Sequence, residues 1–404
     1  MMMGWERLNL HQGEALSLEI GSDGWSGPGK RWGHTCNSVH NGRFLYVFGG
    51  YGKDNRQTNQ VHVFDTVGQT WKEPPISGTP PAPRDSHSCT TVGDNLYVFG
   101  GTDGSNPLSD LHILDTVSHT WRSPFVRGDA PQAREGHSAA PSGKRIFFFG
   151  GCGKSPVNNE EAYYNDLFVF NTETFVWKEM VTTGNRPSPR DSHTCTAWRN
   201  KIIVIGGEDG NNYYLSDVHI LDTETLVWKE LVTTGHKLPP RAGHSSVAIG
   251  NKIFVFGGFT DAQNLYDDIY MLDIVSATWT KVMVTGRQPS PRFSASGACL
   301  HPAVSGVLVF FGGCDKNLEP LDDMFFFHTG LTNVEDDHGV GSISMRKQMK
   351  MKCQEQLTNN FGSQSIFEEK RFFQAKVTER FLAGYGIETL IDGKALRGIL
   401  FSNR

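Results

Sequence analysis

A doublet of glycines recurs six times along this chain of 404 residues, each time after a short apolar run. The doublets stand at 49/50, 100/101, 150/151, 206/207, 257/258 and 312/313, so the distance from one to the next is 50 to 56 residues. Self-similarity at a nearly fixed period indicates a repeat architecture. The runs before the doublets, for example residues 45–48 and 253–256, are rich in aromatic and β-branched side chains, which predicts short strands buried on both faces.

Two further landmarks repeat with the doublets. A second apolar run bracketed by acidic residues follows in several copies, as at 110–115, 217–222 and 268–273. A Trp comes next at 71, 121, 177, 228 and 279, and in all five copies an Arg stands 13 residues beyond it, at 84, 134, 190, 241 and 292. This constant interval predicts one structural unit repeated along the chain.

The combination of a Gly-Gly doublet, a distant Trp and about fifty residues per unit resembles the kelch repeat, and the resemblance covers roughly residues 5–328. It implies an all-β fold, a β-propeller in which each repeat forms a four-stranded blade. The sixth doublet is followed by a strand at 322–327 but by no Trp, whereas Trp5 opens a segment similar to those at Trp177 and Trp228. We therefore predict a six-bladed kelch propeller over residues 1–328, closed by the N-terminal strand, which removes two sheet edges.

The arginines form the first candidate binding site. Each occupies the same place in its repeat, so propeller symmetry is expected to arrange them around one mouth of the central channel. This arginine-lined mouth consists of Arg31, Arg84, Arg134, Arg190, Arg241, Arg292, Asp85 and Asp191. Guanidinium groups suit carboxylates and acidic peptides, which favours ligand capture. Ion pairs between blades, made with Asp85, Asp191 or Glu135, would instead give the ring a structural role, and the sequence leaves both explanations open.

The loops after the doublets form the second candidate site because they differ most from copy to copy. Two of them place aromatic side chains beside acidic or amide groups, a composition typical of protein contacts. The residues concerned are Tyr163, Tyr164, Tyr213 and Tyr214. Ordinary solvated loops would have a similar composition.

Catalytic relatives supply a different class of hypothesis. Kelch proteins resembling the plant nitrile and epithionitrile specifiers hold iron with a Glu-x-x-x-Asp-x-x-x-His pattern, and the closest approach here is Glu319 and Asp323 with Phe327 in the third position. The histidines at 34, 87, 137, 193 and 244 lie on different repeats and are expected to make internal hydrogen bonds rather than converge on a metal. We therefore predict no catalytic residues, metal or cofactor, with an iron-dependent enzyme and a receptor for small anions or peptides as alternatives.

The residues after the repeats differ in composition. An acidic patch at 335–337, a Gly/Ser stretch at 339–344 and a segment at 345–352 with four basic residues predict a linker over 329–366 that carries a short basic helix. Alternating apolar residues around Asp392-Gly393 predict a β-hairpin appendage over 367–404. So few residues bury too little surface to fold alone, so the appendage is expected to dock on the propeller, on a partner or on a second copy of the chain.

Charge and cysteine content restrict the classes of ligand and the cellular compartments that are expected for the chain. With 38 Lys and Arg against 43 Asp and Glu, the chain has no global basic field for nucleic acid. Seven cysteines without a C-x-x-C pair indicate a reducing compartment. No apolar leader or long apolar stretch is present, so neither secretion nor a membrane span is expected. The sequence thus predicts a non-catalytic protein-binding scaffold in the cytoplasm, with the nucleus as the second candidate compartment.

Overall fold

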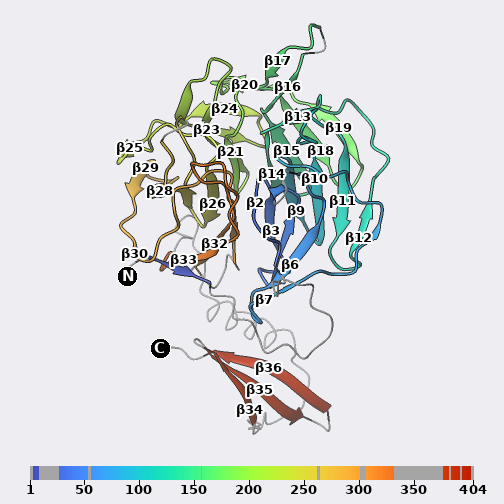
Figure 1. The fold of residues 1–404 in the computed structure, drawn as a ribbon, viewed down its shortest axis with the longest axis vertical. Helices are drawn as coiled ribbons and strands as arrows, with labels where there is room; N and C mark the ends of the chain where they lie inside the picture. Colours follow the sequence, from blue (N-terminus) through green and yellow to red (C-terminus); the bar gives the residue numbers. More distant parts are fainter. Residues whose placement is uncertain are drawn as a thin grey trace, which may run out of the picture. The chain divides into compact units, whose positions relative to one another are not determined.

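The structure is a computed structural model, and it describes residues 3–8, 27–52, 56–155, 157–261, 264–300 and 306–331 in full and 376–381, 384–391 and 394–401 by their backbone. The chain divides into two compact units, Met1–Asp336 and Asp337–Arg404 (Figure 1). The acidic patch at 335–337, the Gly/Ser stretch, the basic segment at 345–352 and the turn at 392–393 all lie outside the described residues.

The first unit is built from strands in sheets of four or five (Figure 1). The first two sheets are β3 (Thr35–Val39), β4 (Phe44–Phe48), β6 (Val61–Asp65) and β7 (Thr70–Lys72), then β8 (Ser77–Gly78), β12 (Thr120–Arg122), β11 (Leu111–Asp115), β10 (Asn95–Phe99) and β9 (Ser88–Val92). The next two are β14 (Ser138–Ser142), β15 (Arg145–Phe149), β18 (Leu167–Asn171) and β19 (Val176–Glu179), then β20 (Thr183–Gly184), β24 (Val227–Glu230), β23 (Tyr214–Asp222), β22 (Lys201–Glu208) and β21 (Thr194–Trp198).

Two further sheets complete this series. They are β25 (Thr234–Gly235), β29 (Thr278–Lys281), β28 (Ile269–Asp273), β27 (Lys252–Phe256) and β26 (Ser245–Ile249), then β30 (Thr285–Gly286), β1 (Gly4–Arg7), β33 (Met324–His328), β32 (Val307–Phe311) and β31 (Ser296–Cys299). Smaller sheets join β2 (Arg31–Trp32) to β5 (Tyr51–Gly52), and β13 (Arg134–Glu135) to β16 (Cys152–Lys154) and β17 (Glu161–Tyr163). The all-β prediction is confirmed.

Apolar side chains on the inner strands explain why the sheets pack face to face. The strand before each doublet lies between two other strands of its sheet, and its last four residues before the doublet are buried, as in β10 and β27. The Trp of one sheet packs against an aromatic ring of the preceding sheet: the centroids of Trp121 and Phe48 are 5.1 Å apart, and those of Trp228 and Phe149 are 5.2 Å apart. Six hydrophobic clusters each contain residues of two neighbouring sheets.

The outer edge of four sheets is a two-residue strand contributed by the preceding repeat. β8, β20, β25 and β30 each end in a Gly and pair in parallel with the strand that carries the Trp. A Cβ on Gly184 would lie 2.2 Å from the carbonyl oxygen of Trp228, and the φ of this residue is +82°, so only glycine fits this approach. Each such strand ties one sheet to the next.

The N-terminal strand lies in the same sheet as the last strand of the repeats. β1 pairs antiparallel with β33, where Trp5 faces Phe327, and parallel with β30, where Trp5 faces Gly286. Trp5 is 5% exposed and packs among Phe256, Phe310 and Phe325.

The second unit contains three described strands in one antiparallel sheet. They are β34 (Lys376–Phe381), β35 (Gly384–Ile391) and β36 (Lys394–Phe401), in that spatial order. The described part of the chain contains no helix with the length and hydropathy required to cross a membrane.

Candidate binding site at the mouth of the repeats

The six predicted arginines are buried clamps inside the sheets. Each side chain is at most 3% exposed. Each Nη1 donates to the carbonyl of the first glycine of its own repeat's doublet, at 2.9 to 3.0 Å, and the acceptors are Gly49, Gly100, Gly150, Gly206, Gly257 and Gly312. The arginine thereby connects the segment that enters a sheet with the end of its central strand.

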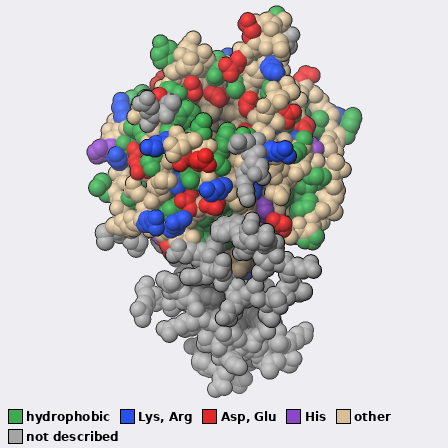
Figure 2. All heavy atoms as spheres, in the orientation of Figure 1, with side chains coloured by type: hydrophobic (Ala, Val, Ile, Leu, Met, Phe, Trp, Pro, Cys, Tyr) green, Lys and Arg blue, Asp and Glu red, His purple; other side chains and the backbone are tan. Residues whose placement is uncertain are grey.

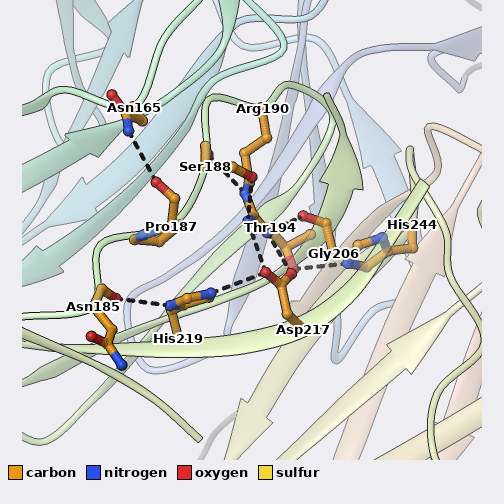
Figure 3. Close-up of polar contacts among 10 residues, drawn as sticks. All are labelled: Asn165, Asn185, Pro187, Ser188, Arg190, Thr194, Gly206, Asp217, His219 and His244. Carbon is orange, nitrogen blue, oxygen red and sulfur yellow. Dashed lines mark hydrogen bonds and ion pairs between the residues drawn. The ribbon is translucent and has the colours of Figure 1, made fainter. Parts of the chain in front are cut away.

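Five of these arginines also pair with an aspartate at the third strand of the same sheet; four of the aspartates directly precede that strand, and Asp217 lies within β23. The pairs are Arg84 with Asp110, Arg134 with Asp166, Arg190 with Asp217, Arg241 with Asp268 and Arg292 with Asp323. Figure 3 shows the Arg190 clamp: Nη1 and Nη2 lie 2.6 and 2.9 Å from the two carboxylate oxygens of Asp217, and Ser188 accepts two further bonds. His219 approaches the same carboxylate at 2.9 Å.

The acid partners differ from those that the sequence analysis considered. Asp85, Asp191 and Glu135 directly follow an arginine, and successive side chains of an extended segment point to opposite sides. The arginine therefore points into its sheet, while the acid after it points away from the clamp. The ion pairs lie within sheets rather than between blades, and the guanidinium groups are enclosed by protein instead of facing a ligand.

The first repeat lacks the acid of the clamp. Gln60 stands where the other repeats have aspartate. The backbone carbonyl of Gln60 accepts a hydrogen bond from the N–H of Gly49, just as the carbonyl of Asp110 accepts one from the N–H of Gly100. Arg31 instead donates to the Pro28 carbonyl and lies 3.5 Å from Nε2 of His62. Burial lowers the pKa of Arg31 to about 10, although the charge of Glu73 opposes this shift.

Next to the clamps, six backbone hydrogen bonds link the repeats in series. The residue two places after each arginine donates its N–H to the carbonyl of the equivalent residue in the preceding repeat, at 2.7 to 3.2 Å, and Gly33 donates to Ser294 of the last repeat. These residues are Gly33, Ser86, Gly136, Ser192, Gly243 and Ser294, and every one has a positive φ between 49° and 64°. Two sets of residues flank this series of hydrogen bonds: the residue directly after each arginine and the residue directly after each doublet. We call these residues together the mouth.

Three consecutive repeats contribute acids to the mouth. They supply Asp85, Glu135, Asp191 and Glu208, and β17 adds Glu161. Burial, followed by the charges of Asp85 and Glu161, raises the pKa of Glu135 to about 7. Burial also raises the pKa of Asp191 to about 7; the hydrogen bond from Ser192 opposes this shift, and the charges of Glu208, Glu135 and Glu161 add to it. We call these five residues the acidic half of the mouth.

The other three repeats contribute four aromatic rings, and Tyr214 of the fourth repeat adds a fifth. The centroid of Trp32 lies 5.3 Å from that of Tyr51 and 6.0 Å from that of Phe293. Phe293 lies 5.2 Å from Phe259, which in turn lies 5.6 Å from Tyr214. All five rings are partly exposed, and we call them the aromatic half of the mouth. Figure 2 shows acidic and hydrophobic side chains side by side near the middle of the displayed face.

Comparison with known proteins identifies the repeat. The model of the KLHDC2/KLHL20/DRC7 Kelch-repeats domain matches residues 8–190 and 155–335. The chain belongs to the kelch-repeat family. Its sheets are therefore those of a kelch β-propeller, and the predicted resemblance is confirmed.

Three relatives illustrate the range of kelch proteins that the chain resembles. Kelch domain-containing protein 3 of Bos taurus is 30% identical over 308 residues, which cover 74% of this chain and 65% of the relative. Acyl-CoA-binding domain-containing protein 4 of Arabidopsis thaliana is 28% identical over 67% of this chain and 32% of the relative. Host cell factor of Drosophila melanogaster is 29% identical over 68% and 17%. The match thus spans less than two thirds of each relative, and none of the three bears an enzyme's name.

The four predicted tyrosines of the kelch loops have different surroundings. Tyr163 lies in β17, and burial together with the charges of Asp191 and Glu161 raises the pKa of its hydroxyl. Tyr164 covers the Arg134 guanidinium at 4.3 Å, so it belongs to a clamp. Tyr214 joins the aromatic half of the mouth, whereas Tyr213 is 68% exposed.

Three of the five predicted histidines make the expected internal hydrogen bonds. His87, His137 and His244 each meet a hydroxyl of the preceding sheet at 2.8 to 3.1 Å, and the buried His34 and His193 make no such bond among the described residues. Asp323 is held by Arg292, and Phe327, in the third position of the iron pattern, is fully buried. Within the described residues, no group of three or more His, Cys, Asp or Glu side chains is arranged to hold a metal ion.

The division of the mouth into an acidic and an aromatic half was missed at the sequence level. The sequence does carry a signal for this division, at two positions of each repeat: the residue after the arginine and the residue after the doublet. The residues after the arginines are Trp32, Asp85, Glu135, Asp191, Ala242 and Phe293, and those after the doublets are Tyr51, Thr102, Cys152, Glu208, Phe259 and Cys314. Reading these positions in repeat order, rather than residue by residue, separates the two halves.

Proposed function

We propose that this kelch protein is a non-catalytic protein-binding module that engages its partner at the mouth. The observation that carries the proposal is the row of neighbouring carboxylates in the acidic half, which raise one another's pKa and lie beside partly exposed aromatic rings. Groups with strongly shifted pKa values that face one another gather at functional sites. The relatives also support a binding role for this chain. They share the kelch repeats but differ in the rest of their length, as expected of a module that serves proteins of different kinds.

We also propose that the six sheets are the blades of one closed propeller, with β1 as the outer partner of β33. Two series of contacts support closure. The backbone bonds of the mouth return from Ser294 to Gly33, and one hydrophobic cluster contains residues of both β32 and β4. Closure places the acidic and aromatic halves opposite each other across one opening, which is the geometry a binding site for a single segment requires.

We further propose a cellular compartment for the protein and a role for its C-terminal sheet. The six described cysteines are free thiols, which supports a reducing compartment, the cytoplasm or the nucleus. We assign the sheet of β34, β35 and β36 a tethering or self-association role, because three strands bury too little surface to be stable alone.

The test is a quantitative affinity purification with the full chain as bait. The wild type is compared with Asp191→Asn/Glu135→Gln, which neutralises two mouth acids, and with Asp129→Asn/Glu224→Gln, which neutralises two exposed acids elsewhere. We expect a protein partner that is retained by the wild type and the control and is reduced with the mouth variant. A wild-type bait that retains no protein partner contradicts the proposed function.

A further inference from the structure

The acids of the mouth form no ion pair with any described cationic residue. None of the ion pairs formed by the described residues involves Asp85, Glu135, Asp191 or Glu208. The closest arginines in sequence, such as Arg190, are turned into their sheets and saturated by other acceptors. Among the described residues, no ion pair therefore neutralises the negative charge of these four acids.

One carboxylate of this group is incompletely bonded. Asp191 accepts from the Ser192 hydroxyl at 3.0 Å through Oδ2, while its Oδ1 is shielded from solvent and has no hydrogen-bond partner among the described residues. Asp85, by contrast, accepts from both Ser86 and Gln57. A buried carboxylate oxygen without a donor is costly, and a donor from a bound molecule would remove that cost.

The aromatic half continues directly from the acidic half. Tyr214 is the junction, because its ring contacts Phe259 and its hydroxyl pKa is raised by burial and by the charge of Glu208. From there Phe293 and Trp32 extend the row of rings to the first repeat. A ligand that follows this row meets carboxylates at one end and π faces along its length.

Resting on the proposed function, we infer that the segment bound at the mouth is basic: an extended peptide whose Arg or Lys side chains enter the acidic half while the chain beside them lies on the aromatic half. Guanidinium and ammonium groups form charge-assisted hydrogen bonds with carboxylates and favourable contacts with aromatic faces, so both halves select the same cation. An acidic peptide or a nucleic acid is repelled by the same charges. The ring of arginines had suggested a negatively charged ligand. Because the arginines are buried and the mouth presents carboxylates, the ligand that we infer is positively charged.

The experiment uses the full chain and three labelled peptides in fluorescence anisotropy. The probes share one Gly/Ser frame and carry three arginines, three citrullines or three aspartates; citrulline keeps the shape of arginine without its charge. The wild type is expected to bind the arginine peptide at least about tenfold more tightly than the citrulline peptide, with an affinity that falls as salt rises. Asp191→Asn/Glu135→Gln is expected to lose this preference, and Asp129→Asn/Glu224→Gln to keep it.

The outcomes separate the inference from the proposed function. Equal binding of the arginine and citrulline peptides, or an arginine preference that survives in Asp191→Asn/Glu135→Gln, overturns the inference. A native partner that is lost with Phe259→Leu but kept with the acid variant also overturns it, while the proposed function stands. Each result is read only if the acid variant is correctly folded, as judged by an unchanged circular dichroism spectrum and a thermal midpoint no lower than that of the wild type.

Discussion

Two aspartates of the same repeat, Asp191 and Asp217, have opposite electrostatic surroundings. Burial alone would raise the pKa of Asp217, but hydrogen bonds and charge from Arg190 and His219 hold it well below its usual value. Asp191, the residue next to Arg190 in sequence, has its pKa raised to about 7 by burial and by neighbouring carboxylates. The carboxylates of the clamps stabilise the fold, whereas those of the mouth lower its stability and remain open to a partner.

The difference follows from strand geometry rather than from residue type. Asp217 lies in the third strand of its sheet, where the guanidinium of Arg190 reaches it bidentately. The mouth acids Asp85, Glu135 and Asp191 directly follow arginines and point to the other side of the chain. A repeat protein can therefore hold its stabilising and its binding carboxylates within one segment, provided that they alternate.

The largest effect is expected from removing a clamp. Arg190→Met leaves Asp217 and the Gly206 carbonyl without their donors, so we expect the free energy of unfolding to fall by about 3 kcal/mol. Urea unfolding followed by Trp fluorescence measures it, because all nine tryptophans precede residue 280 and report on the repeats. Arg186→Met, which removes an exposed arginine nearby, is the control and should change the free energy by less than about 0.5 kcal/mol. Equal effects of the two substitutions would remove the distinction between clamp and surface.

A smaller effect, of opposite sign, is expected from neutralising the mouth. The folded-state pKa of Asp191 and Glu135 is about 7, above the unfolded value near 4, so the folded protein binds more protons in this window. Their contribution therefore lowers stability as the pH rises from about 4 to about 7. Asp191→Asn/Glu135→Gln should lack this slope and be more stable than the wild type by about 1–2 kcal/mol at pH 8. Thermal unfolding across this pH range checks the expectation, and parallel curves for the two proteins would contradict it.

The smallest effect concerns the incomplete clamp of the first repeat. Gln60→Asp places a carboxylate where Arg31 lacks one, and the resulting ion pair is expected to add about 1 kcal/mol to the free energy of unfolding. The gain should vanish when Arg31 is replaced by Met, which a double-mutant cycle of unfolding free energies measures. A gain that persists without Arg31 would show that the acid acts elsewhere.

The periodic features of the sequence predicted the strands but not the directions of the side chains. Apolar runs before the doublets became buried central strands such as β4 and β10, because burial on both faces depends only on residue type and length. The N-terminal Trp5 likewise lies in the sheet of β33, where counting tryptophans had placed it. The arginines were found at equivalent positions, and of the two roles that the sequence left open for them, their burial favours the structural one.

The missing information was the backbone conformation beside each arginine. Ser86, Ser192 and Ser294 adopt a positive φ that a sequence pattern does not reveal, and this turn fixes which neighbour enters the sheet and which faces the mouth. The aspartates of the clamps were visible in sequence only as the acidic residues bracketing a strand. Long-range contacts, such as Arg292 with Asp323, decided their role.

The most direct test of the contrast is a pH titration of the full chain labelled with ¹³C at the aspartate carboxyls, with Asp191 and Asp217 assigned from their Asn variants. Asp191 is expected to titrate near pH 7, and Asp217 to stay ionised well below the ordinary aspartate value near 4. If Asp191 titrates at or below that ordinary value, the mouth carries no uncompensated charge and the two aspartates do not differ as we propose.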